Sequence, residues 1–194
     1  MPSREFLQLG NPLLWEQSLP VEDVFARENQ DFVYDLRDIL TSFRRSSGFG
    51  CGIAAPQIGL PRRVIFIRMQ PTEFSGAVFN PNVEWFSDGG IELWDDCFSL
   101  PNLMVRVSRA ASIRIAHQDE RGSARTITAE GDLPELPRHE LDHLDGVLAV
   151  QRAGSPTGLS TRAEWERSPR RRSANLRAGE AEYGPAGGWP ARFK

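Results

Sequence analysis

Two histidines and a glutamate have the residue types and the spacing of a metal-dependent hydrolase site. His139 and His143 lie four residues apart, and Glu140 follows the first of them, in a chain of 194 residues with only 3 histidines. On a helix this spacing places both imidazoles on one face, with Cβ atoms about 5–6 Å apart, so that they can bind one ion. Glu140 lies about 100° around the helix from His139, where it is a poor ligand but can take a proton from a water at the metal. The motif predicts hydrolysis, with Glu140 as general base.

A third ligand is needed, because a catalytic metal usually has three protein ligands and one open position. Cys97, in the segment 94–101, is the other soft donor in a motif-like setting. Taken alone, it is better explained as a small buried hydrophobic residue. With Cys51, the chain has 2 cysteines, which are too few for a disulfide framework.

The elements that must position these residues follow from hydrophobic periodicity. Apolar residues recur with a helical period from Phe32 to Phe43, which predicts an amphipathic helix ending at 46–48. The composition of 64–67 and 77–79 predicts buried strands. The motif helix is expected to begin near Asp132 and Pro134 and to end at Gly146.

Two hairpins are also expected. Segments 83–86 and 91–98 are predicted to pair through the turn at 87–90, and segments 112–117 and 125–128 through the turn at 119–122. His117 continues the apolar face of the second hairpin, so we interpret it as a packed or edge residue and not as a ligand.

Composition limits the classes of function. The length predicts one domain, for which we take 1–154, followed by a poorly packed tail over 155–194 with a short helix at Arg162 to Arg167. The formal net charge of -3 argues against DNA binding, and no apolar run is long enough for a membrane span. No signal peptide is visible, so we expect a cytoplasmic protein. The run from Arg170 to Arg172 could contact ribosomal RNA, although a solvated terminus is the favoured interpretation.

Three segments, in this order, resemble the three motifs of the peptide deformylases. They read GCGIAAPQ at 50–57, CFS at 97–99 and HELDH at 139–143. The likeness extends to 9–13 and 61–64, and together the three motifs are specific. The resemblance implies an α+β fold in which antiparallel β-sheets surround a metal-binding α-helix. It also implies hydrolysis of the formyl group from N-formylmethionyl peptides of nascent proteins leaving the ribosome.

The resemblance implies a role for each matching residue. Cys97, His139 and His143 would bind one divalent metal ion, usually Fe²⁺, with Zn²⁺, Ni²⁺ or Co²⁺ as alternatives. Glu140 would move the proton from the attacking water to the leaving amine.

The other motif residues would handle the substrate. Gln57, through its side-chain amide, and Phe98, through its backbone N–H, would donate to the oxyanion of the tetrahedral intermediate. Gly50 and Gly52 would line the cleft in which the peptide adds as an extra strand.

The second motif departs from the family pattern, which usually reads Glu-Gly-Cys-Leu-Ser. Asp95 is a shorter acid that we expect to pair with Arg109, as in the family's acid–arginine pair. Asp96 is the larger change, because it adds a side chain and a negative charge beside the metal where glycine is usual.

The motif helix departs from the pattern as well. Arg138 replaces the usual glutamine, and Pro137 lacks an N–H, which requires that the helix start near it or be distorted. Glu135 lies four residues before His139 and is expected on the same face, as a substrate-binding residue in the cleft. A buried acid there would disfavour a thioether side chain.

These departures leave three alternatives open. Asp96 and Glu135 motivate a divergent deformylase-like amidase that acts on another acyl amide. A catalytically silent homologue could keep the metal for binding. A conventional zinc protease normally needs a further His or Glu ligand downstream, and no histidine follows His143.

Overall fold

The computed structural model of the chain describes residues 5–47, 51–68, 74–130 and 135–168. The helices are α1 (Arg27–Ser47), α2 (Glu135–Leu144), α3 (Ala149–Arg152) and α4 (Arg162–Arg167), with 3-10 helices η1 (Pro12–Trp15), η2 (Ala55–Ile58) and η3 (Pro156–Gly158). The strands are β1 (Gly52–Ala54), β2 (Val64–Arg68), β3 (Ser75–Phe86), β4 (Gly90–Asp96), β5 (Leu103–Ala110), β6 (Ser112–Gln118), β7 (Ala124–Glu130) and β8 (Leu159–Thr161).

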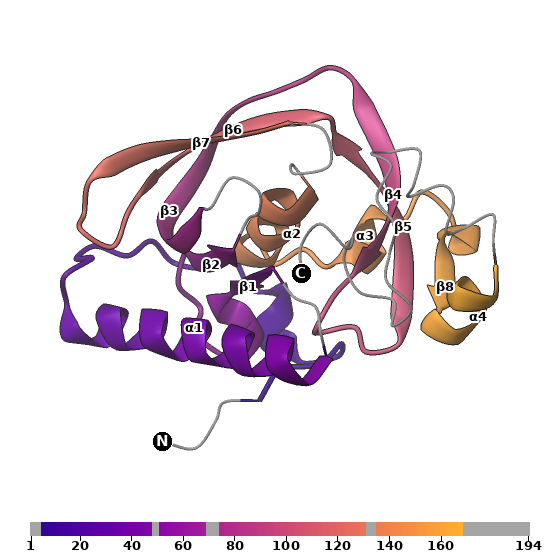
Figure 1. Ribbon diagram of the computed structural model, residues 1–194, viewed down its shortest axis with the longest axis horizontal. Coiled ribbons are helices and arrows are strands. Elements are labelled where there is room, and N and C mark those ends of the chain that lie inside the picture. Colours follow the sequence, from indigo (N-terminus) through magenta and orange to yellow (C-terminus); the bar gives the residue numbers. More distant parts are fainter. Residues whose placement is uncertain (1–4, 48–50, 69–73, 131–134, 169–194) are drawn as a thin grey trace.

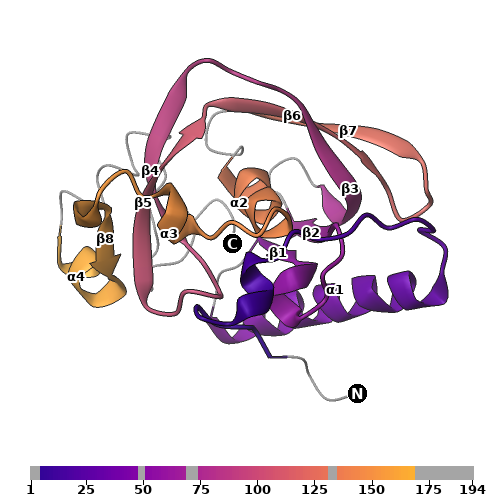
Figure 2. The ribbon, with the colours of Figure 1, turned by 180° about the vertical axis from the view of Figure 1, so that it is seen from behind.

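Helix α2 is surrounded by β-structure. One sheet has the strand order β1-β2-β3-β6-β7 and the other the order β4-β5-β8, and their pairings are antiparallel. Figures 1 and 2 show α2 between the sheets, α1 outside the first sheet, and β8 with α4 beside β5. The expected α+β fold, with antiparallel sheets around the motif helix, is confirmed.

Strand β2 is buried on both faces, which explains its unbroken apolar sequence. Successive side chains of a strand point to opposite sides. Val64 and Phe66 therefore pack in the cluster that contains Leu36 of α1, whereas Ile65 and Ile67 pack in the cluster that contains Leu141 of α2. The amphipathic helix α1 therefore covers one face of β2, and α2 packs against the other face.

The ends of both long helices follow their local sequence. Helix α1 ends at Ser47, within the predicted stop. After α2, Gly146 has φ of +70°, and a Cβ there would lie 2.5 Å from the carbonyl oxygen of Trp15. Pro137 is the third residue of α2, in the first turn, where an N–H has no partner within the helix. The expected cap at Asp132 and Pro134 lies outside the described residues.

One of the two predicted hairpins is wrong. Strand β3 continues through Pro81, with Asn80 at φ of +48° and a shift of register between Phe79 and Asn82. This bulge carries the chain past proline, so that residues 83–86 pair with β6, while β4 pairs with β5. The turn at 87–90 therefore passes the chain from one sheet to the other. The second hairpin, β6 with β7, is confirmed.

The segment after residue 154 begins with packed structure. Strand β8 pairs with β5, the expected short helix is present as α4, and Trp165 is 1% exposed. Residues 155–168 therefore belong to the packed body, while 169–194, with the arginine run, lie outside the described residues. The domain boundary at 154 stays a prediction, although the tail expected after it is packed over 155–168. Among the described helices, none has the length and apolar character that crossing a membrane requires.

Candidate metal centre

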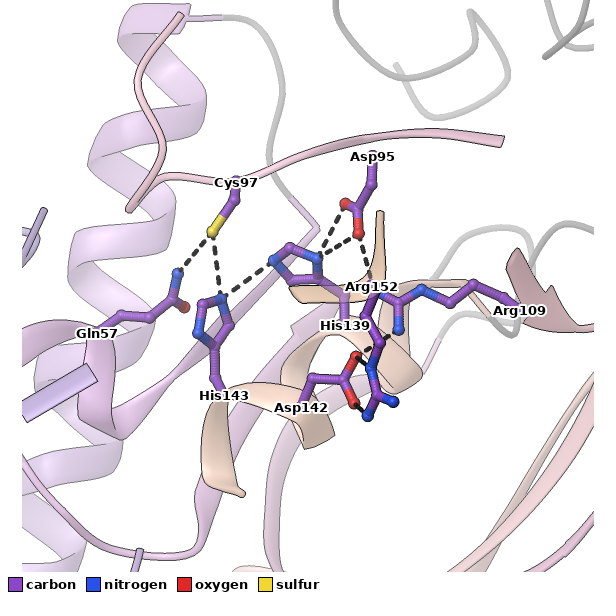
Figure 3. Close-up of polar contacts among 8 residues, drawn as sticks. All are labelled: Gln57, Asp95, Cys97, Arg109, His139, Asp142, His143 and Arg152. Carbon is purple, nitrogen blue, oxygen red and sulfur yellow. Dashed lines mark hydrogen bonds and ion pairs between the residues drawn. The ribbon is translucent and has the colours of Figure 1, made fainter. Parts of the chain in front are cut away.

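Three soft or borderline donors meet at the centre of the molecule. Donor atoms of Cys97, His139 and His143 all lie within 4.8 Å of one another, and the three residues are buried. The Nε2 atom of His143 is 3.2 Å from Cys97 Sγ and 3.2 Å from His139 Nε2 (Figure 3). Two ligands of a tetrahedral zinc-like ion lie about 3.3–3.6 Å apart, given bonds of about 2.0–2.3 Å. The sulfur and two nitrogens therefore fit one divalent cation and leave a fourth position open.

A chain of charged groups fixes the orientation of His139. Its Nδ1 donates to Asp95 at 2.9 Å, and Asp95 is bound by Arg109 at 2.8 Å. Arg109 also binds Asp142 at 2.6 Å, and Arg152 binds the other side of Asp142 at 2.7 Å. Because a carboxylate only accepts hydrogen bonds, Nδ1 of His139 carries a proton and Nε2 is left to face the other two donors. The predicted pair of Asp95 with Arg109 is confirmed.

The sequence reasoning missed Asp142 and Arg152. The only signal in the sequence was that Asp142 is a carboxylate inside the motif helix, one residue before His143. Its contact with the buried Arg109 exists only in the folded chain. Burial by itself would raise the pKa of Asp142, but hydrogen bonds and charge from Arg152 and Arg109 lower it. Asp142 is therefore an anion that holds Arg109 in place from the side opposite Asp95 (Figure 3).

The electrostatics of the donors favour a bound cation. Burial lowers the pKa of His143 well below its usual range, with a further contribution from His139, so its ring is neutral and can donate a lone pair. Burial raises the pKa of the Cys97 thiol. A thiolate at this position needs a positive partner, and a metal ion supplies one. The buried Nδ1 of His143 has no hydrogen-bond partner among the described residues.

The carboxyl group of Glu140 lies against strand β1. It is 3% exposed, and its Oε2 has no hydrogen-bond partner in the described part of the chain. A Cβ built on Gly52 would lie 2.5 Å from Oε1 of Glu140 and 2.7 Å from Leu136. Burial raises the pKa of Glu140 to about 7. A carboxyl group with this pKa can accept and return a proton near neutral pH.

Gln57 points its amide nitrogen toward the donors. Its Oε1 accepts from the backbone N–H of Ala54 at 2.9 Å, which orients the amide. Its Nε2 lies 3.7 Å from Cys97 Sγ and 3.4 Å from Ser99 Oγ. The residue is 1% exposed, so this orientation is held inside the protein, with the two N–H groups next to the centre.

Phe98 contributes its ring to the core and not to the centre. The ring centroid lies 4.8 Å from that of Phe6 and 4.3 Å from that of Phe43 on α1. This aromatic contact anchors the backbone directly after Cys97. The expected role of Phe98 uses only its backbone N–H, so the ring is free to act as the anchor.

Two of the departures from the family pattern, Asp96 and Arg138, lie away from the three donors, whereas Asp95 binds His139. Asp96 points to the opposite face of β4 from Asp95 and forms an ion pair with Arg162 at 2.5 Å. Arg138 lines a pocket of about 700 Å³ together with Arg63 and Asp145, and none of the three donors lines that pocket.

Two of the predicted substrate-binding residues cannot be placed. Gly50 lies outside the described residues. Glu135 begins α2, but its side chain is not among those that the structure describes. Both assignments stay predictions. Gly52, the third, is the residue of β1 against which Glu140 lies.

Comparison with known proteins gives one consistent result. The family model described as "Polypeptide deformylase" matches residues 3–157. A peptide deformylase of Parafrankia sp. (strain EAN1pec) is 33% identical over 175 residues, which cover 88% of this chain and 92% of that protein. The crystal structure of a Synechococcus elongatus peptide deformylase in complex with actinonin is similar with a TM-score of 0.71 and 26% identity, covering 81% of this chain and 82% of the other. The Met-Ala-Ser-bound peptide deformylase of Acinetobacter baumannii is similar with a TM-score of 0.65 and 26% identity, covering 76% of this chain and 96% of the other.

Proposed function

Because the chain belongs to the polypeptide deformylase family, we propose that it is a metal-dependent hydrolase that removes the formyl group from N-formylmethionyl peptides. One observation carries this proposal. Donor atoms of three buried residues lie within 4.8 Å of one another, and the buried Glu140, whose Oε2 is unpartnered among the described residues, directly follows the donor His139 on α2. This is the arrangement that amide hydrolysis at a metal requires.

We propose that Cys97, His139 and His143 hold one divalent ion, with Fe²⁺ as the physiological metal and Zn²⁺, Ni²⁺ or Co²⁺ able to replace it. When bound, such an ion lowers the pKa of water and polarises the formyl carbonyl group. Asp95 keeps Nε2 of His139 available for the ion through its bond to Nδ1. The thiolate makes the iron form sensitive to oxidation at sulfur.

Glu140 is the proposed proton carrier. Its carboxylate takes a proton from the attacking water and returns that proton to the nitrogen of the leaving amine. Burial among Leu136 and Gly52 keeps the carboxylate out of bulk solvent and raises its pKa to about 7. With this pKa, Glu140 can both accept the proton of the water and release it to the amine near neutral pH.

Gln57 and Phe98 are the proposed oxyanion donors. Gln57 presents Nε2 next to Cys97, and the backbone N–H of Phe98 follows the ligand directly. Removing one such donor typically costs about 2.7–4 kcal/mol of transition-state stabilisation. We therefore expect Gln57→Ala to lower kcat by about 10²- to 10³-fold with little change in metal content.

Strand β1 is the proposed docking edge for the substrate. It is an edge strand of its sheet, so a peptide can add to it as a further strand. Gly52 leaves the space that the carboxylate of Glu140 occupies. A Cβ at position 52 would press on both Glu140 and Leu136, so Gly52→Ala is expected to displace the carboxylate and to lower turnover without loss of metal.

Asp96 no longer supports a different substrate. Its carboxylate is paired with Arg162 on the outer face of β4 and does not face the donors. The case for another acyl amide then rests on Glu135 alone. Contact with the ribosome and a cytoplasmic location stay part of the proposal, as the setting in which formyl peptides arise.

The test is turnover of formyl-Met-Ala-Ser by protein purified without oxygen and loaded with Fe²⁺. Release of formate is expected for the wild-type chain, together with about one ion per chain. Glu140→Ala should keep the ion and lose turnover; activity that survives this change would show that the proton carrier is misassigned. Cleavage of other acyl amides, with none of formyl-Met-Ala-Ser, would replace the proposed substrate.

A further inference from the structure

The loop that carries Cys97 is held at both ends by a single residue. This loop, residues 97–102, joins β4 to β5 and contains the proposed metal ligand and the proposed oxyanion donor Phe98. At its start, the carboxylate of Asp96 binds Arg162 at 2.5 Å. At its end, the carbonyl oxygen of Asn102, which has φ of +61°, accepts from the backbone N–H of Arg162 at 2.8 Å. Arg162 therefore ties the two ends of the loop together.

Arg162 is in turn fixed by its own segment. It follows β8, whose residues Leu159–Thr161 pair with β5, and it begins α4. In α4, Trp165 is 1% exposed and packs with Trp94 and Met104 on the outer face of the sheet. Figure 2 shows β8 and α4 against β5, on the side away from α2. The tie is thus a built part of the fold and not a contact between two loose side chains.

The ion pair joins one residue of the second motif to one residue outside the span of the family model. Asp96 occupies a position where the motif it resembles usually has glycine, and the family model ends at residue 157, before Arg162. The side chains of Asp96 and Arg162 are 17% and 18% exposed, so water screens the pair only in part.

We propose that Arg162 is a positioning residue for Cys97 and Phe98, acting through Asp96 and Asn102 to hold the ligand loop closed. This proposal rests on the proposed function, because it assumes that Cys97 is a metal ligand. The side chain of Arg162 pairs with Asp96, and Trp165 packs with Trp94 and Met104. Their effect is to limit the movement of the loop, and hence the rate at which the thiolate leaves the ion.

The test measures release of Co²⁺ from the loaded full-length protein into excess chelator, together with the thiolate-to-cobalt absorption band. Residues that orient ligands typically change metal affinity by 10–100-fold, so Arg162→Gln is expected to release the ion about tenfold faster and to change the band. Arg162→Lys keeps the charge and should restore release to within about threefold of wild type. Arg167→Gln is the matched control, because Arg167 lies in the same helix and its side chain, paired with Glu164, is 73% exposed.

A double-mutant cycle separates the tie from a general loss of stability. In an Asp96→Gly chain, Arg162→Gln should have no further effect on release. An equal effect in both backgrounds, or release from Arg162→Gln no faster than from Arg167→Gln, would overturn the proposal. If Arg162→Gln does not fold, Asp96→Asn removes the same ion pair from the other side, and faster release is again expected, with unchanged release counting against the tie.

The outcome for the wild-type chain distinguishes this proposal from the proposed function. A wild-type protein that binds no Co²⁺ would overturn the metal centre, and the tie with it. A protein that binds about one Co²⁺ per chain, with release insensitive to Asp96 and Arg162, would overturn the tie alone.

Discussion

The two faces of strand β4 carry the same kind of ion pair at different depths. On the face toward α2, the side chains of Asp95 and Arg109 are each 1% exposed. On the opposite face, Asp96 and Arg162 are 17% and 18% exposed. The inner pair also binds His139, whereas the outer pair joins two segments of backbone.

Burial determines how much each of these ion pairs contributes to stability. A fully buried carboxylate needs every partner it has, and breaking such a pair typically costs about 3–5 kcal/mol. A fully exposed pair contributes about 0–1 kcal/mol, because water replaces the lost contact, and the partly buried pair of Asp96 and Arg162 lies between these two limits. We therefore expect the pair on the inner face of β4 to determine whether the metal centre forms. The pair on the outer face should affect how fast the centre releases its ion.

The largest effect is expected from Cys97→Ala on the inner face. The change removes the sulfur donor, so the metal content should fall from about one ion per chain to none, and turnover should disappear with it. Metal analysis after anaerobic purification measures this. Cys51→Ala is the control, because Cys51 packs in the core cluster beside β2 and not at the centre; retention of a full equivalent by Cys97→Ala would contradict the ligand assignment.

Arg109→Ala is expected to be the next largest change. It leaves the carboxylates of Asp95 and Asp142 buried without this shared partner. The free energy of unfolding should fall by about 3–5 kcal/mol, measured by urea denaturation of the metal-free protein. A loss below about 1 kcal/mol, the range of exposed pairs, would mean that water reaches the inner face.

Trp165→Ala tests the apolar contact between α4 and the outer face of β4 and β5. Trp165 is 1% exposed and packs on Trp94 and Met104, so its truncation should cost about 3 kcal/mol of unfolding free energy. Trp85→Ala provides the comparison, since Trp85 is 48% exposed. If both variants unfold at the same urea concentration, α4 does not contribute to the stability of the sheet.

The smallest effect is expected from Arg106→Ala. Arg106 lies on the outer face of β5, and its side chain and that of its partner Glu92 are 50% and 62% exposed. The unfolding free energy should change by less than about 1 kcal/mol, with metal content and turnover unchanged. A larger loss would show that exposure on this face is not a guide to the strength of its ion pairs.

Local sequence determined the parts of the protein that depend on neighbours along the chain. The spacing of His139 and His143 fixes their common face because a helix repeats every 3.6 residues. The apolar period of α1, the alternation in β6 and the stop at Gly146 are local in the same sense. The resemblance to a family then supplied Cys97, which no local pattern could join to the histidines.

Tertiary structure alone decided which distant segments meet. The pairing of 83–86 with β6 could not be read from the sequence, because a bulge at Asn80 carries the strand past Pro81 and strand pairing depends on the whole sheet. The same holds for Asp142 beside Arg109 and for Arg162 beside Asp96. Each sequence position offers a charge, but only the folded chain determines which opposite charge lies within reach and how much water remains between them.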